Sequence, residues 1–379
     1  MTRTHTPHRT TLAVLLLMLM PLLASANMPN TLLAYKFPEL AQHFNAFEIV
    51  HAAIFEEIVQ TNDSPQSAIG KNLLRESLAE LARKRGSHYH TAGDHLAMLG
   101  PYRVFESRVT PGLLAMIQQD YSHEQAESAF ADSGILPPDA VAILQRGRAF
   151  QARIMEISID GGILDKRAAI NETVAEYLSN KRHSLPPQPK SSDLLSKHPQ
   201  AYAFRVGFPQ LSGLSWATTW LNLAALEIII TGTDEDWMLD AGVERAVALY
   251  VDKISRQHGT MALLPTDIPT APVVAPNLYS AHREVATIID NLTMFEIVLA
   301  DVLAHPDVLD RPAAMAAVIE QYTDRENFLD KEIDYLTFVL RGGIYNQGGP
   351  ALGGMMQSER NRSRDALENP HVNINRLQM

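Results

Sequence analysis

The chain contains no cysteine among its 379 residues. The absence of thiols excludes disulfide bonds, cysteine-ligated zinc sites, iron–sulfur clusters and thioether-attached haem. A hydrophobic core must therefore stabilise the fold by itself. A chain of this length with 46% hydrophobic residues can build such a core, and its length favours two domains over one.

Basic residues are also in short supply, with 32 lysines and arginines against 43 aspartates and glutamates. The formal net charge is −11. A negative protein is repelled by a phosphate backbone and by an anionic lipid surface. We therefore expect no nucleic-acid partner and no role at a membrane surface.

The first 26 residues have the pattern of a secretory signal peptide. Arg3 and Arg9 make the start basic, an apolar stretch covers 12–23, and the small-x-small sequence ASA follows at 24–26. This apolar stretch is short for a transmembrane helix. We predict a signal peptide over 1–26 and an exported protein, either periplasmic or extracellular.

A second apolar stretch, Leu214–Thr231, is long enough to raise the question of a membrane span. It contains Asn222 and Glu227 and is bounded by Gly213 and Gly232. These polar residues favour a helix buried in a protein core. We therefore expect no integral membrane span after signal cleavage.

Helical periodicity runs through nearly the whole chain, and no segment alternates as a strand would. Between Pro38 and Gln60, apolar residues recur at spacings of three, four and seven, which defines one face of a helix. Ser64 followed by Pro65 is typical of a helix start. We predict an all-α fold of amphipathic helices. Further helices are expected over 139–159, 165–180, 278–304 and 311–341.

Segments rich in proline or glycine interrupt the helical periodicity. The stretch KRHSLPPQPKSSDLLSKHPQ at 181–200 has four prolines and no helical period, which indicates a linker or a surface crossing. The expected organisation is two packed helical subdomains followed by an irregular tail. The ranges are 27–183 for the N-terminal subdomain, 184–199 for the linker, 200–341 for the C-terminal bundle and 342–379 for the Gly/Arg-containing tail.

Three histidines and an aspartate gather within SHYHTAGDHL, at 87–96. Neutral imidazole is a good ligand for zinc and iron, and three histidines leave a coordination position free for water. A polar loop between helices, with Asp94 capping the segment that follows, is the first interpretation. The alternative hypothesis is a divalent-metal site with the ligands His88, His90, Asp94 and His95.

A second candidate metal pair is Glu48 and His51, whose E-x-x-H spacing places both on one helix face. Di-iron bundles use this spacing twice, together with a glutamate from each of two other helices. The only other such pair is Glu368 and His371, which is interrupted by a proline, while Glu296 and Glu326 flank apolar stripes and can supply carboxylates. The alternative for His51 is a buried, hydrogen-bonded core histidine.

One internal echo links the two halves. The tetrapeptide FEIV at 47–50 recurs at 295–298. A four-residue match is expected on the order of once by chance in a chain of this length, so we interpret it as coincidence. The alternative is a distant duplication of helical halves.

No complete catalytic motif stands out, since the chain lacks a nucleophile elbow, a P-loop and a dinucleotide fingerprint. Our first functional hypothesis is an exported helical binding or assembly protein of the cell envelope, acting through protein–protein contacts, for example in a secretion or conjugation apparatus. The second is a metal-dependent hydrolase or metal carrier built on the histidine loop. A third is a ligand pocket lined by Trp216, Trp220 and Trp237.

Overall fold

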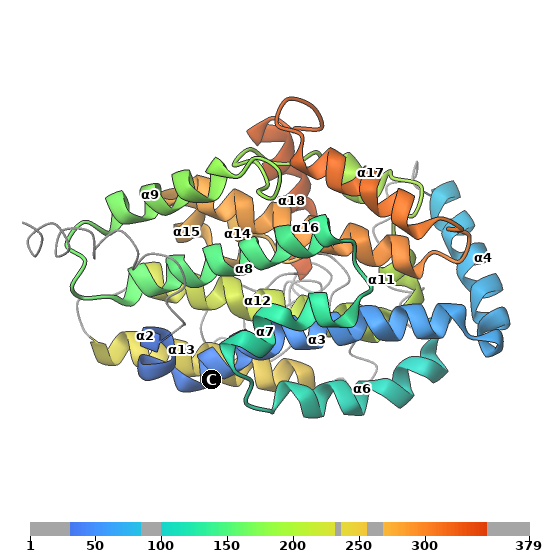
Figure 1. The fold of residues 1–379 in the computed structure, drawn as a ribbon, viewed down its shortest axis with the longest axis horizontal. Coiled ribbons are helices and arrows are strands. Elements are labelled where there is room, and N and C mark those ends of the chain that lie inside the picture. Colours follow the sequence, from blue (N-terminus) through green and yellow to red (C-terminus); the bar gives the residue numbers. More distant parts are fainter. Residues whose placement is uncertain (1–30, 85–99, 232–235, 256–267, 347–379) are drawn as a thin grey trace, which may run out of the picture.

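A computed structural model describes residues 31–84, 100–231, 236–255 and 268–346. These residues form helices joined by turns and short loops, with no β-strand among them, so the all-α prediction is confirmed for this part of the chain (Figure 1).

Four long helices form the centre of the molecule. They are α3 (Pro38–Asp63), α8 (Pro138–Ile159), α12 (Pro209–Thr231) and α16 (Arg283–Ala304). Helices α3 and α8 both pack against α12 and α16, so the two halves of the chain contribute to one hydrophobic core (Figure 1). Helix α12 is buried on nearly all sides, as its continuous apolar sequence requires.

The remaining helices cover this centre. Helix α6 runs alongside α3, and α4 crosses the end of the bundle where α3 ends and α6 begins (Figure 1). The bounds are α2 (Thr31–Lys36), α4 (Ala68–Lys84), α6 (Arg103–Ile117), α7 (His123–Ser133), α9 (Lys166–Ser179), α10 (Ser192–Ser196), α11 (Ala203–Gly207), α13 (Asp236–Ser255), α14 (Ala271–Val274), α15 (Pro276–Ala281), α17 (Arg311–Thr323) and α18 (Glu332–Asn346), with a 3₁₀ turn at Pro65–Ser67.

Helices α8 and α16 approach closely because a glycine lies at their crossing. A Cβ added at Gly147 would lie 2.6 Å from the methyl carbons of Leu292, which is far inside van der Waals contact. The glycine therefore fixes the distance between these two central helices.

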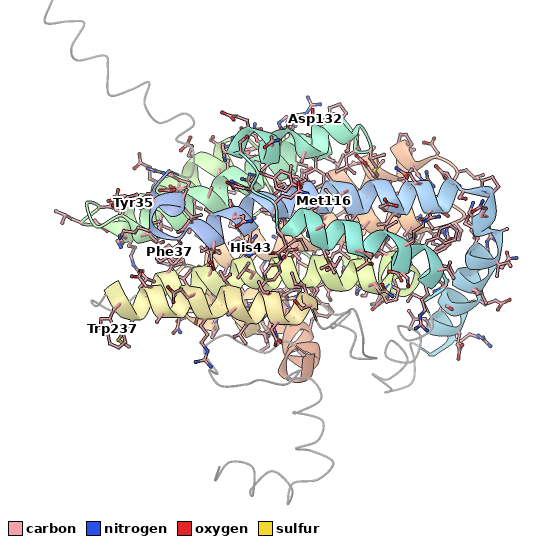
Figure 2. The ribbon with its side chains drawn as sticks, turned by 90° about the horizontal axis from the view of Figure 1, so that it is seen from below. Tyr35, Phe37, His43, Met116, Asp132 and Trp237 are labelled. Atoms are coloured by element: carbon pink, nitrogen blue, oxygen red, sulfur yellow. The ribbon has the colours of Figure 1, made fainter. Side chains whose placement is uncertain are left out.

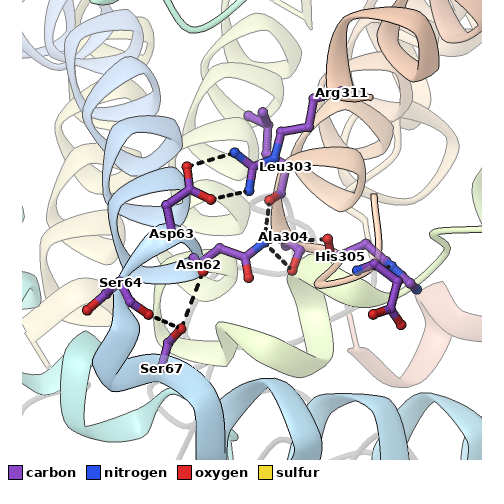
Figure 3. Close-up of polar contacts among 9 residues, drawn as sticks. Asn62, Asp63, Ser64, Ser67, Leu303, Ala304, His305 and Arg311 are labelled. Atoms are coloured by element: carbon purple, nitrogen blue, oxygen red, sulfur yellow. Dashed lines mark hydrogen bonds and ion pairs between the residues drawn. The ribbon is translucent and has the colours of Figure 1, made fainter. Parts of the chain in front are cut away.

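The C-terminal ends of α3 and α16 are tied together, so the two helices run in the same direction (Figure 3). Asn62 Nδ2 donates to the carbonyl oxygens of Leu303 at 3.1 Å and Ala304 at 3.4 Å. Arg311 donates through two nitrogens to the Asp63 carboxylate, at 3.0 and 2.7 Å. The side-chain amide of Asn62 thus pairs with carbonyl oxygens at the end of α16 that have no partner within that helix.

Buried carboxylates hold the shorter segments onto the long helices. The first backbone N–H groups of a helix lack partners inside the helix, and the helix dipole favours negative charge there. Four buried carboxylates in the described part of the chain, each on a distant helix, accept from such N–H groups. The pairs are Glu106 with the start of α12, Asp301 with α11, Glu227 with α15 and Asp290 with α14.

Glu106 illustrates what this arrangement costs. Its Oε1 accepts from the backbone N–H of Gln210 at 2.8 Å and of Leu211 at 3.1 Å. Burial raises the pKa of Glu106 to about 8, although these two hydrogen bonds oppose the rise. Carboxylates that accept from helix starts in this way have a structural role, so we do not count them among the candidate functional groups.

The helix boundaries follow the sequence closely in several places. The helices predicted from Pro38, at 139–159 and at 165–180 are confirmed, each within three residues at either end. Ser64 accepts from the backbone N–H of Gln66 at 3.2 Å, as its predicted capping role requires. Helical periodicity of this strength is thus sufficient to locate these elements.

Two long predicted helices are wrong as single elements. The segment 311–341 is divided into α17 and α18, because the Asp324 side chain accepts from the backbone N–H groups of Glu326 and Asn327, both at 2.8 Å, and turns the chain. The segment 278–304 is divided into α15 and α16 at His282, which has φ −138° and ψ 62°.

The proline-rich stretch at 181–200 crosses the bundle and is anchored by a buried lysine. Lys190 is fully buried, and its Nζ donates to the carbonyl oxygens of Gln321 and Asn327 at 2.7 and 3.4 Å, and to that of Asp324. Its backbone N–H donates to Asn291 Oδ1 at 2.9 Å. The stretch is therefore fixed to the region between α17 and α18.

Among the described residues, α12 alone is long and apolar enough to cross a membrane by length and composition. Its most apolar window is 83% buried inside the bundle. This burial is what we predicted for Leu214–Thr231 as a core helix.

Candidate functional site

A cluster of ionisable side chains lies where the four long helices meet. Glu48 and His51 come from α3, Arg148 from α8, Thr218 from α12 and Glu296 from α16. Each of these residues is less than 10% exposed. The core of a helical bundle is a common place for functional groups, because facing helices direct side chains toward one point. We call these five residues the core cluster.

A hydrogen-bonded chain passes through the imidazole of His51. Its Nε2 lies 2.7 Å from Thr218 Oγ1, and its Nδ1 contacts Glu296 Oε1. The Thr218 hydroxyl donates its single proton to the backbone carbonyl of Ser215 at 2.9 Å. Thr218 therefore accepts from His51 Nε2–H. The other ring nitrogen, Nδ1, faces the Glu296 carboxylate, so both ring nitrogens of His51 have a polar partner.

The order hydroxyl, imidazole, carboxylate is also that of a catalytic triad. In such a triad the hydroxyl proton points at the imidazole, which takes it as general base. Here the Thr218 proton is given to Ser215, and Thr218 is only 4% exposed. Thr218 is therefore not positioned as a nucleophile, and Thr218 and Glu296 together fix the orientation of the His51 ring.

Glu48 and Arg148 are the other two ionisable side chains of the core cluster. Burial, helped by the nearby Glu296 carboxylate, raises the pKa of Glu48 to about 7, although Arg148 and His51 oppose the rise. Arg148 donates to the Phe44 carbonyl at 3.0 Å and to Asn45 Oδ1 at 2.7 Å, and its guanidinium lies 4.6 Å from the centre of the Phe44 ring. The guanidinium is thus fixed beside α3, while the Glu48 carboxyl can change its charge near neutral pH.

Both glutamates of the core cluster come from the repeated tetrapeptide FEIV, at 47–50 and 295–298. The two copies lie in α3 and α16, which pack against each other and run in the same direction. Chance and duplication both remain interpretations of the repeat.

The predicted metal pair Glu48 and His51 thus lies in the core with Glu296, one of the two carboxylates suggested to complete it. Glu326, the other, is exposed in the turn after α17. Among residues in the described ranges, no group of three or more histidines, aspartates or glutamates is placed to hold a metal ion. Metal binding by Glu48 and His51 stays a prediction.

The other predicted metal ligands, His88, His90, Asp94 and His95, lie outside the described residues. The same is true of the second E-x-x-H pair, Glu368 with His371, and of the tail from 347 onward.

Two members of the core cluster escaped the sequence analysis. Arg148 follows Gly147 on the buried side of α8, and an arginine on an apolar stripe was the signal that could have found it. Thr218 gave a weaker signal, since threonine is common in buried helices and its role depends on a residue 167 positions away.

Comparison of the chain with protein-family models, with curated proteins and with solved structures finds no match.

Proposed function

We propose that this chain is an exported helical protein of the cell envelope that acts by binding a partner protein, as one component of an assembly such as a secretion or conjugation apparatus. The signal-peptide pattern at 1–26 supports export. The observation that carries the binding role is an apolar surface at one end of the bundle.

Three apolar side chains are exposed near the starts of α4 and α6: Ile69, Leu73 and Val104, which are 75%, 46% and 83% exposed. Ile69 and Leu73 are one helical turn apart, on the side of α4 that faces away from the core. The start of α4 is packed on the start of α6, because Gly70 lies directly against the Tyr102 ring. We call these three side chains the α4–α6 surface.

Burying this surface against a partner is energetically useful. Complete burial of one aliphatic side chain of this size contributes about 1.5–3 kcal/mol. The proposed occupant is an apolar patch on a partner protein of the assembly. Two further exposed aromatic residues, Tyr35 and Trp237, lie at the opposite end of the molecule (Figure 2).

A photo-crosslinking residue placed at Leu73 in the native cells tests this proposal. We expect a discrete cross-linked product at Leu73, which an additional Ile69→Glu change removes. The control position is Leu164, which is 99% exposed. It lies in the connection between α8 and α9, which is at the opposite end of the molecule from α4 (Figure 1). Equal products at both positions, or none at Leu73, would contradict the proposal.

The tail offers a second test. It carries Arg360, Arg362, Arg364 and Arg376, which suit contacts with an acidic partner. Truncation after Asn346, where α18 ends, is expected to weaken partner binding and to leave the melting temperature unchanged. Unaltered cross-linking at Leu73 in the truncated protein would remove the tail from the proposal without affecting the α4–α6 surface.

The alternative function is a metal-dependent hydrolase or a metal carrier. It rests on the sequence of the histidine loop, where zinc or iron would be held by His88, His90, Asp94 and His95. Elemental analysis of protein purified from its native compartment separates the two functions. A stoichiometric metal that is lost in the double variant His88→Ala/His90→Ala favours the alternative, and its absence from native protein counts against it.

A further inference from the structure

The turn that follows α16 is held by the imidazole of His305 (Figure 3). His305 comes directly after the last residue of α16, and its backbone N–H donates to the Asp301 carbonyl at 3.0 Å. The backbone N–H of Asp307 donates to His305 Nδ1 at 3.2 Å. A backbone N–H can only donate, so Nδ1 must accept and carries no proton. The neutral imidazole with its proton on Nε2 is therefore the form that fits this turn.

Asp307, which this hydrogen bond orients, joins the turn to α4. Arg75 of α4 donates from Nε to Asp307 Oδ1 at 2.9 Å, and its Nη2 lies 2.7 Å from the same oxygen. Arg75 is itself positioned by Asn72, because its Nη1 donates to Asn72 Oδ1 at 2.8 Å. A continuous link thus runs from the His305 ring through Asp307 to the helix that crosses the end of the bundle (Figure 1).

Four charged or titratable groups of the described chain act on the His305 ring. Burial lowers the pKa of His305 below its ordinary value of 6.5; Asp307 and Asp301 oppose this change, whereas Arg75 and His198 add to it. His198 has a different role, because its Nε2 lies 3.2 Å from Asp301 Oδ2. A proton on His198 would strengthen that contact, whereas a proton on His305 Nδ1 would break one.

We infer that His305 is a pH-sensitive link between α16 and α4, which acid opens. A proton from solvent at Nδ1 turns the acceptor into a second donor that faces the Asp307 N–H. The hydrogen bond is then lost, and the ring no longer holds Asp307 in the orientation in which Arg75 binds it.

The expected change is a looser α4 and not an unfolded protein. The start of α4 keeps its packing, because Gly70 lies directly against the Tyr102 ring. Helix α4 also carries Ile69 and Leu73, so opening would alter the α4–α6 surface. Only this last consequence rests on the proposed function, since the link itself can be measured on the protein alone.

The sign and the upper limit of the effect follow from proton linkage. A closed link excludes the proton, whereas an opened link leaves His305 with its ordinary pKa of 6.5. Each pH unit below that value can therefore favour the opened form by up to a factor of about ten. Between pH 7.5 and pH 5.5 we expect the opening of α4 to increase by up to about tenfold.

Hydrogen exchange of the α4 amides in the full chain, corrected for the intrinsic exchange rate at each pH, measures this opening. In His305→Asn the amide oxygen can accept from the N–H two residues on but cannot titrate. The opening of α4 in this variant should change less than twofold between the two pH values. The matched control is His282→Asn, at the other end of α16, because burial also lowers the pKa of His282. Its α4 response should equal that of the original protein.

Three results would overturn the inference. One is an α4 response that persists in His305→Asn, which would assign it to another group such as His198. The second is a response lost equally in His282→Asn. The third needs no variant: ¹⁵N NMR of the imidazoles in the original protein at pH 7.5, with His305 identified through its backbone resonances, should show the proton on Nε2. A proton on Nδ1, or α4 exchange that does not respond to pH, would contradict the link directly.

Discussion

The strongest test of the core cluster is the substitution Glu48→Gln. The variant keeps the size and shape of the side chain but cannot ionise. Burial raises the pKa of Glu48 from 4.5 to about 7 in the folded protein. Between these two values the folded state keeps a proton that the unfolded chain has released, so stability falls as pH rises through this range.

The size of this effect follows from the two pKa values. At about 1.4 kcal/mol for each pH unit, a rise from 4.5 to about 7 is equivalent to about 3 kcal/mol of stability, present below pH 4.5 and lost above pH 7. Glu48→Gln removes this loss. The free energy of unfolding of the variant, relative to the original protein, is expected to increase by about 3 kcal/mol between pH 4.5 and pH 8.

Urea denaturation followed by circular dichroism at pH 4.5, 6, 7 and 8 measures this difference. The comparison between pH values cancels any constant effect of losing the contact with Arg148. The matched control is Glu172→Gln, an exposed glutamate of α9. Its stability should follow that of the original protein at every pH. Parallel pH profiles for Glu48→Gln and the original protein would refute our account of the core cluster as a buried titrating site.

Three further predictions concern packing and buried polar groups, and each is read from the urea midpoint. Gly147→Ala should destabilise by about 1–3 kcal/mol because its methyl group meets α16, whereas Gly112→Ala, with open space around it, should stabilise by up to about 1 kcal/mol; similar effects at both sites would argue against the close crossing. Lys190→Met should cost about 3 kcal/mol by leaving carbonyl oxygens unpaired. Burial lowers the pKa of Lys190 from 10.5 to about 8. The original protein should therefore become more stable as the pH rises from about 8 to 10.5, whereas the variant should not. Thr218→Val should cost about 1–3 kcal/mol by removing the acceptor for His51, and Thr218→Ser should restore most of it; equal losses in both would assign the effect to packing.

Local sequence patterns were sufficient to predict a helical fold and the positions of several helices. The apolar spacing from Pro38, the cap at Ser64 and the continuous apolar stretch at 214–231 are local signals, because a helix repeats every 3.6 residues and each turn depends on residues three or four positions away. These signals correctly predicted α3, the start of the 3₁₀ turn that follows it, and the buried helix α12. The E-x-x-H spacing likewise placed Glu48 and His51 on one face.

The contacts between residues far apart in the sequence, in contrast, follow only from the fold. His51 contacts Glu296 across 245 positions and Thr218 across 167, and Glu106 caps a helix that begins about 100 positions later. No local pattern encodes such pairs, because they depend on how whole helices pack. The break between α17 and α18 also went unseen, since Asp324 ends its helix through hydrogen bonds that compete with a continuing apolar period. Helix periodicity is a property of neighbouring residues, whereas a buried polar cluster forms only when separate helices share one core.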